Sequence, residues 1–155
     1  MVEDGIAEMG ILGSLTGWGL KKSPWVYHLN AGACNNCDIE VAELLTPRFD
    51  VERLGVQLAG SPRHADALMV TGICTRQIRP RLQEIYRQTA KPCLVLCLGA
   101  CACTGGIFHD AWHFAGPVDT VVREVDPDAN IAYIPGCPPK PEAMISGLAT
   151  ALEEL

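Results

Sequence analysis

The sequence has no segment that resembles a secretory leader, no apolar run long enough to cross a bilayer, and no excess of basic residues. Glu3 and Asp4 stand where a leader carries basic residues, and no two arginines are adjacent, so we expect neither secretory nor twin-arginine export. Residues 6–20 are largely apolar but include four glycines, whereas a membrane-spanning helix needs about 20 predominantly apolar residues. The 12 Lys and Arg against 18 Asp and Glu give a net charge of −6, which argues against a nucleic-acid partner.

Eight cysteines are many for a chain of 155 residues. Without a leader we expect a reducing compartment, where paired cysteines indicate metal binding or redox chemistry rather than disulfides. The length and the 48% content of hydrophobic residues are sufficient for one domain with its own core. We expect that domain at 23–155, preceded by an arm at 1–22 that either contacts a partner or is loosely held.

Short apolar runs alternate with segments of helical periodicity along this domain. The expected strands are 25–29, 49–54, 67–71, 93–98 and 131–134. The expected helices run from Asp38, as its cap, to Pro47, from Arg79 to Gln88, and from Pro138 to Leu155. Strands that alternate with helices predict an α/β fold, a doubly wound parallel sheet with right-handed crossovers.

Four cysteines directly follow expected strands, namely Cys34 and Cys37, then Cys101, then Cys137. Because the loops at the carboxyl ends of parallel strands meet at one edge of a sheet, these cysteines are expected to lie together. Four thiolates are the ligand set of a cubane [4Fe–4S] cluster. Two alternatives stay open at this point: a structural zinc site with four thiolates, and a thioredoxin-like redox pair at Cys34 and Cys37.

The remaining cysteines and one histidine have other expected places. Cys93 and Cys97 lie four residues apart on one expected strand, hence on the same face, and are expected to be buried thiols. Cys74 and Cys103 fall in loops at the proposed metal edge; a ligand role, a place beside the ligands and a redox-sensitive thiol all stay open for them. His28 lies within the first expected strand and is expected to be packed or hydrogen-bonded, with proton handling as the alternative.

Three motifs occur in order: Cys-x-x-Cys-Asp-Ile-Glu at 34–40, Gly-x-Cys-Ala-x-x-Gly-Gly at 99–106, and Gly-Cys-Pro-Pro at 136–139. Together they resemble the small subunit of [NiFe] hydrogenases, and the segments 22–30, 45–53 and 60–66 resemble the membrane-bound, energy-converting group. This group shares its fold with the 20 kDa [4Fe–4S] subunit of respiratory complex I, whose first two cysteines are usually adjacent. Here Asn35 and Asn36 separate them, which favours the hydrogenase side.

The resemblance implies a flavodoxin-like parallel sheet with one proximal [4Fe–4S] cluster at the carboxyl edge of the strands. By matching motifs, the cluster ligands would be Cys34, Cys37, Cys101 and Cys137, whereas Cys103 falls at a variable position. The chain would carry no catalytic residue. It would relay electrons to or from the nickel–iron site of a large catalytic subunit.

The resemblance also implies the setting of the chain. Its partners would be that large subunit, a ferredoxin-like two-cluster subunit and integral-membrane subunits that couple electron transfer to ion translocation. The chain would then lie peripherally on the cytoplasmic face of the membrane. The alternatives are the equivalent cluster subunit of a complex I-like quinone or sulfur-reducing oxidoreductase and, in a different class, a zinc-stabilised interaction module.

Overall fold

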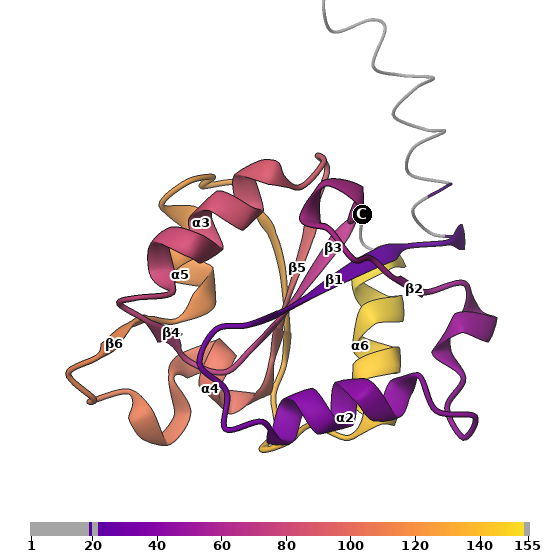
Figure 1. The fold of residues 1–155 in the computed structure, drawn as a ribbon, viewed down its shortest axis with the longest axis horizontal. Helices are drawn as coiled ribbons and strands as arrows, with labels where there is room; N and C mark the ends of the chain where they lie inside the picture. Colours follow the sequence, from indigo (N-terminus) through magenta and orange to yellow (C-terminus); the bar gives the residue numbers. More distant parts are fainter. Residues whose placement is uncertain (1–18, 20–21, 154–155) are drawn as a thin grey trace, which may run out of the picture.

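Five parallel strands form the central sheet of the protein (Figure 1). The computed structural model describes residue 19 and residues 22–153, so most of the arm expected at 1–22 lies outside the described residues. The strands are β1 (Trp25–Asn30), β2 (Gln57–Leu58), β3 (Ala67–Thr71), β5 (Leu94–Leu98) and β7 (Asn130–Ile134). Their spatial order is β2-β1-β3-β5-β7, with every pairing parallel. This is the strand order of a flavodoxin-like doubly wound sheet, so the predicted fold class is confirmed.

Helices cover both faces of the sheet (Figure 1). One face carries α2 (Asn36–Leu44) and α6 (Pro141–Glu153), whose buried residues share a core cluster with the strands. The other face carries α3 (Arg79–Gln88), α4 (Gly99–Thr104) and α5 (Val118–Arg123). Within the described part of the chain, no helix combines the length and the apolarity needed to cross a membrane.

Strands β3 and β5 account for two of the continuous apolar runs in the sequence. Every residue of β3 and β5 is buried. Successive side chains of a strand point to opposite faces, and accordingly Leu68 and Val70 pack under α3 and α5 whereas Met69 packs under α2 and α6. A strand that is covered on both faces is therefore apolar along nearly its whole length.

The prediction of a strand at 49–54 is wrong. Residues Val51–Leu54 form a 3-10 helix, η1, and the edge strand β2 follows it with only two residues. Asp50 (φ 45°) and Gly55 (φ 92°) are both left-handed, which turns the chain at each end of η1 and is incompatible with an extended run. Ser23 holds the second turn, since its hydroxyl donates to the Gly55 carbonyl at 3.0 Å.

Several short elements do not appear in the sequence-based expectation. These are α4, α5, the 3-10 helices η2 (Pro62–His64) and η3 (Gly106–Phe108), and an antiparallel pair made of β4 (Cys74–Thr75) and β6 (Phe114–Gly116). Each has at most six residues, too few for a helical or strand period to stand out. The terminal helix begins at Pro141 rather than at Pro138.

Truncating a side chain in a fully buried strand is expected to destabilise the fold. Leu96 is fully buried in the middle of β5, so Leu96→Ala is expected to lower the free energy of unfolding by about 3 kcal/mol through lost burial and a residual cavity. Denaturant unfolding of the full chain measures this. Ile107→Ala, at a side chain that is 89% exposed, is expected to cost less than about 0.5 kcal/mol. Equal losses for the two variants would contradict the assignment of the core.

Candidate metal centre

Three parallel strands deliver four cysteines to one edge of the sheet. Cys34 and Cys37 follow β1, Cys101 lies in α4 directly after β5, and Cys137 follows β7. Their thiols are close enough to act on one another: burial is the largest cause that raises the pKa of Cys37 to about 11, and the thiols of Cys34, Cys101 and Cys137 add to it. Burial, then Cys137 and Cys34, also raise the pKa of Cys101. The structure therefore gathers the four cysteines, while their role as metal ligands stays a prediction.

Glycines leave room around the sulfurs at this edge. Gly99 has φ 84°, and a Cβ there would stand only 2.8 Å from the Cys37 sulfur. A Cβ at Gly106, with φ 51°, would stand 3.3 Å from the Cys101 sulfur. Both positions thus need glycine for backbone conformation and for space. A larger residue at either one would crowd any group bound by these sulfurs.

A backbone hydrogen bond joins the second and third cysteine segments. The Ala100 N–H donates to the Gly136 carbonyl at 2.8 Å. This bond links the first turn of α4, which carries Cys101, to the loop after β7, which carries Cys137. The two segments are 36 residues apart in sequence, from 101 to 137, and they meet because β5 and β7 are paired in parallel.

The first cysteine loop enters helix α2 through a left-handed residue. Asn35 precedes the helix with φ 74°, a conformation that asparagine tolerates better than most residues. Helix α2 therefore begins at Asn36, and Cys37 lies in its first turn. The expectation that Asp38 caps this helix is wrong, because the capping position is Asn35 and no side chain makes a capping hydrogen bond there.

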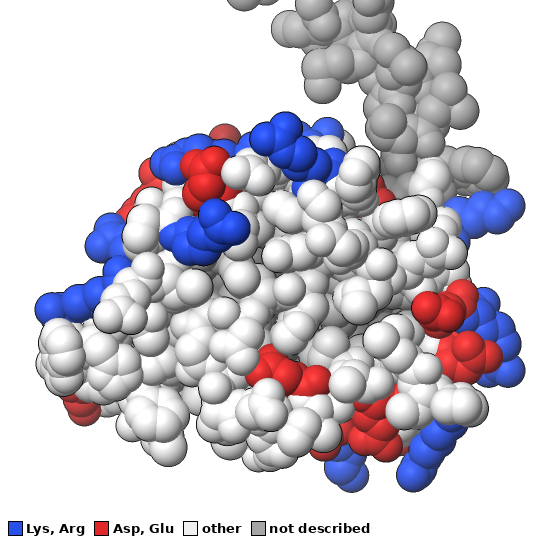
Figure 2. Space-filling view, viewed as in Figure 1, with Lys and Arg blue, Asp and Glu red and all other residues white. Residues whose placement is uncertain are grey.

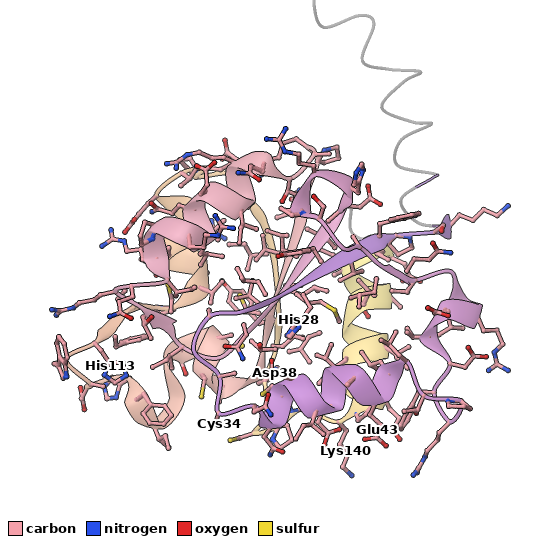
Figure 3. All side chains as sticks on the ribbon, viewed as in Figure 1. His28, Cys34, Asp38, Glu43, His113 and Lys140 are labelled. Atoms are coloured by element: carbon pink, nitrogen blue, oxygen red, sulfur yellow. The ribbon has the colours of Figure 1, made fainter. Side chains whose placement is uncertain are left out.

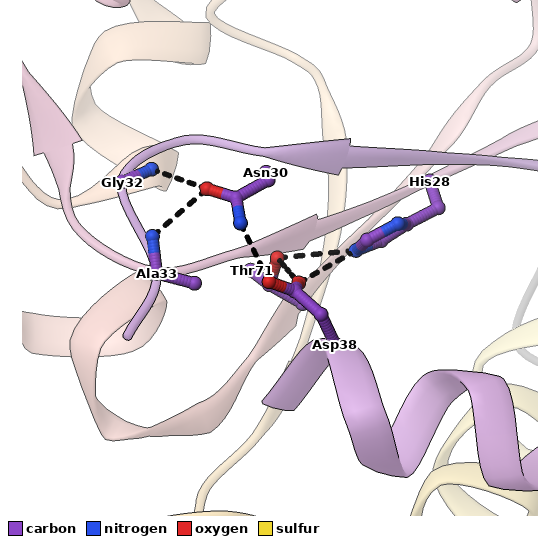
Figure 4. A network of polar contacts seen from close by, with 6 residues as sticks. All are labelled: His28, Asn30, Gly32, Ala33, Asp38 and Thr71. Carbon is purple, nitrogen blue, oxygen red and sulfur yellow. Dashed lines mark hydrogen bonds and ion pairs between the residues drawn. The ribbon is translucent and has the colours of Figure 1, made fainter. Parts of the chain in front are cut away.

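Asp38 is instead the centre of a polar network that joins α2 to two strands (Figure 4). His28 Nε2 in β1 lies 3.0 Å from Asp38 Oδ1 and 3.1 Å from Thr71 Oγ1 at the end of β3. Thr71 donates its hydroxyl to the same Asp38 oxygen. A carboxylate only accepts hydrogen bonds, so His28 Nε2 carries the proton in this contact. The prediction that His28 is hydrogen-bonded within the protein is confirmed.

Asn30 carries the network into the cysteine loop (Figure 4). Its Nδ2 donates to Asp38 Oδ2. Its Oδ1 accepts from the backbone N–H groups of Gly32 and Ala33, both at 2.9 Å. One side chain thus connects the start of α2 to the turn that precedes Cys34. Sequence reasoning missed this network, since His28, Asn30, Asp38 and Thr71 belong to three separate elements.

The gathered cysteines lie at the surface rather than in a closed cavity. Cys34 and Cys137 are exposed, Cys101 is half-buried and Cys37 is buried. Figure 3 shows Cys34 at the outer end of the loop, with Asp38 and His28 further toward the sheet. Any group held here has a protein-covered side and a side that a partner can approach.

The other four cysteines divide into a buried set and one neighbour of the site. Cys93 and Cys97 are buried under α3 and α5 as predicted. Cys74 is fully buried in β4, and the charged groups that act on it are Arg79 and Glu124 rather than any of the gathered thiols. The structure thus places Cys74 away from the site.

Cys103 lies close to the site without facing it. It is half-buried in α4, and its thiol donates to the Cys97 carbonyl at 3.3 Å. Burial is the largest cause that raises its pKa, and Cys101 makes a small contribution. Cys103 therefore borders the gathered cysteines, while its thiol is engaged with the strand behind them.

Within the described residues, no three His, Cys, Asp or Glu side chains are placed to hold a single metal ion.

The electrostatics of the four thiols indicate what a bound group must supply. Burial and mutual repulsion favour the protonated form of Cys37 and Cys101, so together the thiols oppose their own ionisation. A metal group must therefore supply positive charge to hold them as thiolates. Four thiols, the space left by the glycines and a half-open position fit an iron–sulfur cluster.

Comparisons with known proteins agree with this arrangement. Residues 34–151 match the family described as NADH ubiquinone oxidoreductase, 20 Kd subunit. The chain is 48% identical to the probable membrane-bound hydrogenase subunit mbhJ of Pyrococcus furiosus, over 86% of this chain and 77% of that protein. It is 41% identical to a subunit of the NADH-quinone oxidoreductase of Bdellovibrio bacteriovorus, over 93% of this chain and 72% of that protein.

A solved structure extends the likeness to three dimensions. It is the membrane-bound sulfane sulfur reductase, described as an archaeal respiratory membrane complex. One of its chains is 34% identical and superposes with a TM-score of 0.71, over 90% of this chain and 73% of that chain. Relatives of this protein thus occur in complexes named for hydrogen, quinone and sulfur chemistry.

The buried thiols predict how stability depends on alkaline pH. Burial raises the pKa of Cys93 from about 9.0 to about 12, so between these values the unfolded chain has lost a proton that the folded chain keeps. The stabilisation from this group is complete below about pH 9 and falls as pH rises, by up to about 1.4 kcal/mol per pH unit.

Denaturant unfolding as a function of pH measures this dependence. Cys93→Ala is expected to make this dependence less steep, because the variant lacks one of the titrating thiols. Val95→Ala makes a cavity at a nearby, fully buried position without removing a titratable group and is expected to keep the wild-type slope. A Cys93→Ala variant that loses stability with pH as steeply as Val95→Ala would contradict the assignment.

Proposed function

Because the chain belongs to the family of the 20 kDa subunit of NADH ubiquinone oxidoreductase, we propose that it is the electron-transfer subunit of a membrane-bound [NiFe] hydrogenase complex. The observation that carries the proposal is the meeting of four thiols, from segments far apart in sequence, at the carboxyl edge of the sheet. The 48% identity to a membrane-bound hydrogenase subunit supports the choice of complex.

The cofactor of this proposal is one [4Fe–4S] cluster held by Cys34, Cys37, Cys101 and Cys137. When bound, such a cluster supplies one-electron transfer at a potential set by its surroundings. Each of the four thiolates binds one iron, which leaves no iron open to a substrate. The chain therefore relays electrons and contributes no catalytic residue.

The chain's own residues position the cluster and cover one side of it. On the side of the buried Cys37 the site is enclosed by protein, and the lack of a side chain at Gly99 leaves room for backbone close to the Cys37 sulfur. The exposed Cys34 and Cys137 face outward. Electron transfer between subunits needs such an open side, because the nickel–iron site of the proposal belongs to the large catalytic subunit.

The surface near the cysteines suits contact with other subunits. Ile39 and Ile107, close in sequence to Cys37 and Cys101, are 59% and 89% exposed, and Trp112 is 79% exposed. In Figure 2 most Lys and Arg side chains lie around the periphery of the view, and carboxylates also lie in its lower middle. Exposed apolar side chains such as those of Ile39, Ile107 and Trp112 are buried in stable interfaces between subunits.

We propose three kinds of partner for this surface. They are the large catalytic subunit, a ferredoxin-like two-cluster subunit that exchanges electrons with the chain, and integral-membrane subunits that translocate ions. In such a complex residues 23–155 act as the single cluster-binding domain and residues 1–22 as a partner-contacting arm. The chain lies peripherally on the cytoplasmic face of the membrane.

A second candidate is the equivalent subunit of a quinone or sulfur-reducing complex. The 41% identity to a quinone oxidoreductase subunit and the likeness to the sulfane sulfur reductase favour it. The same four cysteines and the same cluster serve that function. The two-residue spacer Asn35-Asn36 between the first two cysteines and the higher identity to the hydrogenase subunit favour the hydrogenase.

The cluster and its ligands are tested by analysis of the anaerobically purified chain. We expect about four iron and four acid-labile sulfide per chain and an EPR signal on reduction. Cys→Ser at position 34, 37, 101 or 137 is expected to lower the iron content and to alter or abolish the signal. Cys74→Ser and Cys103→Ser are the matched controls and are expected to keep both.

Two results would count against the proposal. A full cluster with an unchanged spectrum in Cys101→Ser or Cys137→Ser would refute the ligand assignment. One zinc per chain without sulfide would instead support the zinc-stabilised interaction module.

The choice of complex is tested on the intact assembly purified through this chain. We expect nickel in the preparation and H₂ evolution from a reduced low-potential donor. We also expect a large subunit with two Cys-x-x-Cys pairs, the ligand set implied by the family resemblance. A complex that lacks nickel but reduces a quinone or a sulfane sulfur compound would transfer the proposal to the second candidate.

A further inference from the structure

Asp38 is the most connected charged side chain near the gathered cysteines, and the proposed electron relay does not explain it. It directly follows Cys37 in the first turn of α2, and its side chain is only 13% exposed. Three side chains donate to it: His28 and Asn30 from β1, and Thr71 from β3. Helix α2 does not use it as a cap, so its carboxylate serves another purpose.

We infer that Asp38 is the positioning residue of the first cysteine loop and a fixed negative charge that lowers the reduction potential of the bound cluster. The positioning part concerns the chain alone. The part on the potential rests on the proposed function, because it requires a cluster at Cys37 and its neighbours. Each part has its own measurement.

The positioning follows from the direction of the hydrogen bonds. Because Asn30 Nδ2 donates to Asp38, the amide oxygen of Asn30 faces the N–H groups of Gly32 and Ala33. An amide turned the other way would place its NH₂ against those two N–H donors. Asp38 therefore sets the orientation of Asn30, and through it the turn that leads into Cys34.

Thr71 completes the link to the rest of the sheet. It is fully buried at the end of β3, beside β1, and its carbonyl accepts from the Ala31 N–H at 2.8 Å. Its hydroxyl donates to Asp38. The loop and the start of α2 are thus tied to the same residue, Thr71, which fixes the place of Cys37 relative to the sheet.

The effect on the potential follows from charge and burial. Asp38 directly follows Cys37 in the first turn of α2, and its carboxylate is largely buried there. A charge that is largely removed from water is screened less than a charge on the surface. Negative charge beside a cluster favours its oxidised form and so lowers its reduction potential.

The positioning is tested on the full chain without metal, by amide hydrogen exchange at Gly32 and Ala33. Thr71→Val keeps the shape of threonine but removes the hydroxyl, and we expect exchange at both amides to be faster by about tenfold. Asp38→Asn is expected to do the same, because asparagine has one acceptor oxygen in place of two and cannot accept from both Asn30 and Thr71. Thr71→Ser keeps the hydroxyl and is expected to keep wild-type protection, as is the exposed Glu52→Gln.

The effect on the potential is tested by redox titration of the loaded chain, followed by EPR. Asp38→Asn is expected to titrate at a higher potential than the wild type, whereas Thr71→Ser and Glu52→Gln are expected to keep the wild-type midpoint and spectrum. An Asp38→Asn chain that is folded but fails to load would also support the positioning role.

The outcomes separate the two parts of the inference from the proposed function. Wild-type protection at Gly32 and Ala33 in both Asp38→Asn and Thr71→Val would overturn the positioning role. A loaded Asp38→Asn chain with the wild-type midpoint would overturn the role of the charge. A wild-type chain that takes up no iron and sulfide would refute the proposed function, while the exchange experiment would still decide the positioning role.

Discussion

The parallel direction of the strands is the constraint on which the rest of this structure depends. Because β1, β3, β5 and β7 all point the same way, their loops end at one edge of the sheet. Cysteines from three segments therefore meet there, although more than a hundred positions separate Cys34 from Cys137. An antiparallel strand in this set would send its loop to the opposite edge. The continuous apolar runs of β3 and β5 serve the same constraint, since a parallel sheet must be covered on both faces.

Gathering four thiols has an electrostatic cost that shapes the site. Burial and repulsion raise the pKa values of Cys37 and Cys101, so the chain alone favours neutral thiols. Among the described residues, the charged groups that act on these two thiols include no cation. The fold instead places the carboxylate of Asp38 beside Cys37 and satisfies that carboxylate with three side-chain donors. Such an arrangement suits a group that brings its own positive charge.

Sequence reasoning finds the long elements and fails where local geometry decides. The buried strands and the helix at 79–88 are predicted within one residue, because their apolar periods are unambiguous. The region 49–54 contains Val51 and Leu54 and reads as a strand, yet left-handed turns at Asp50 and Gly55 make it a 3-10 helix. Helices α4 and α5 are too short to show a period. Asp38 has the sequence context of a helix cap, and a local pattern cannot show a partner on β3.

The sequence by itself determined the class of the fold, through its apolar runs, and the candidate ligands, through cysteine motifs placed directly after strands. Only the tertiary structure decided which cysteines come together. Cys74 and Cys103 also follow or border strand ends, but Cys74 is buried in β4 beside Arg79, and the Cys103 thiol is engaged with the Cys97 carbonyl. The tertiary structure also decided the contacts of Asp38, Asn30 and Thr71. The physical reason is that apolar periodicity and motif spacing are local properties, whereas contacts between loops depend on strand order and on the turns that aim each side chain.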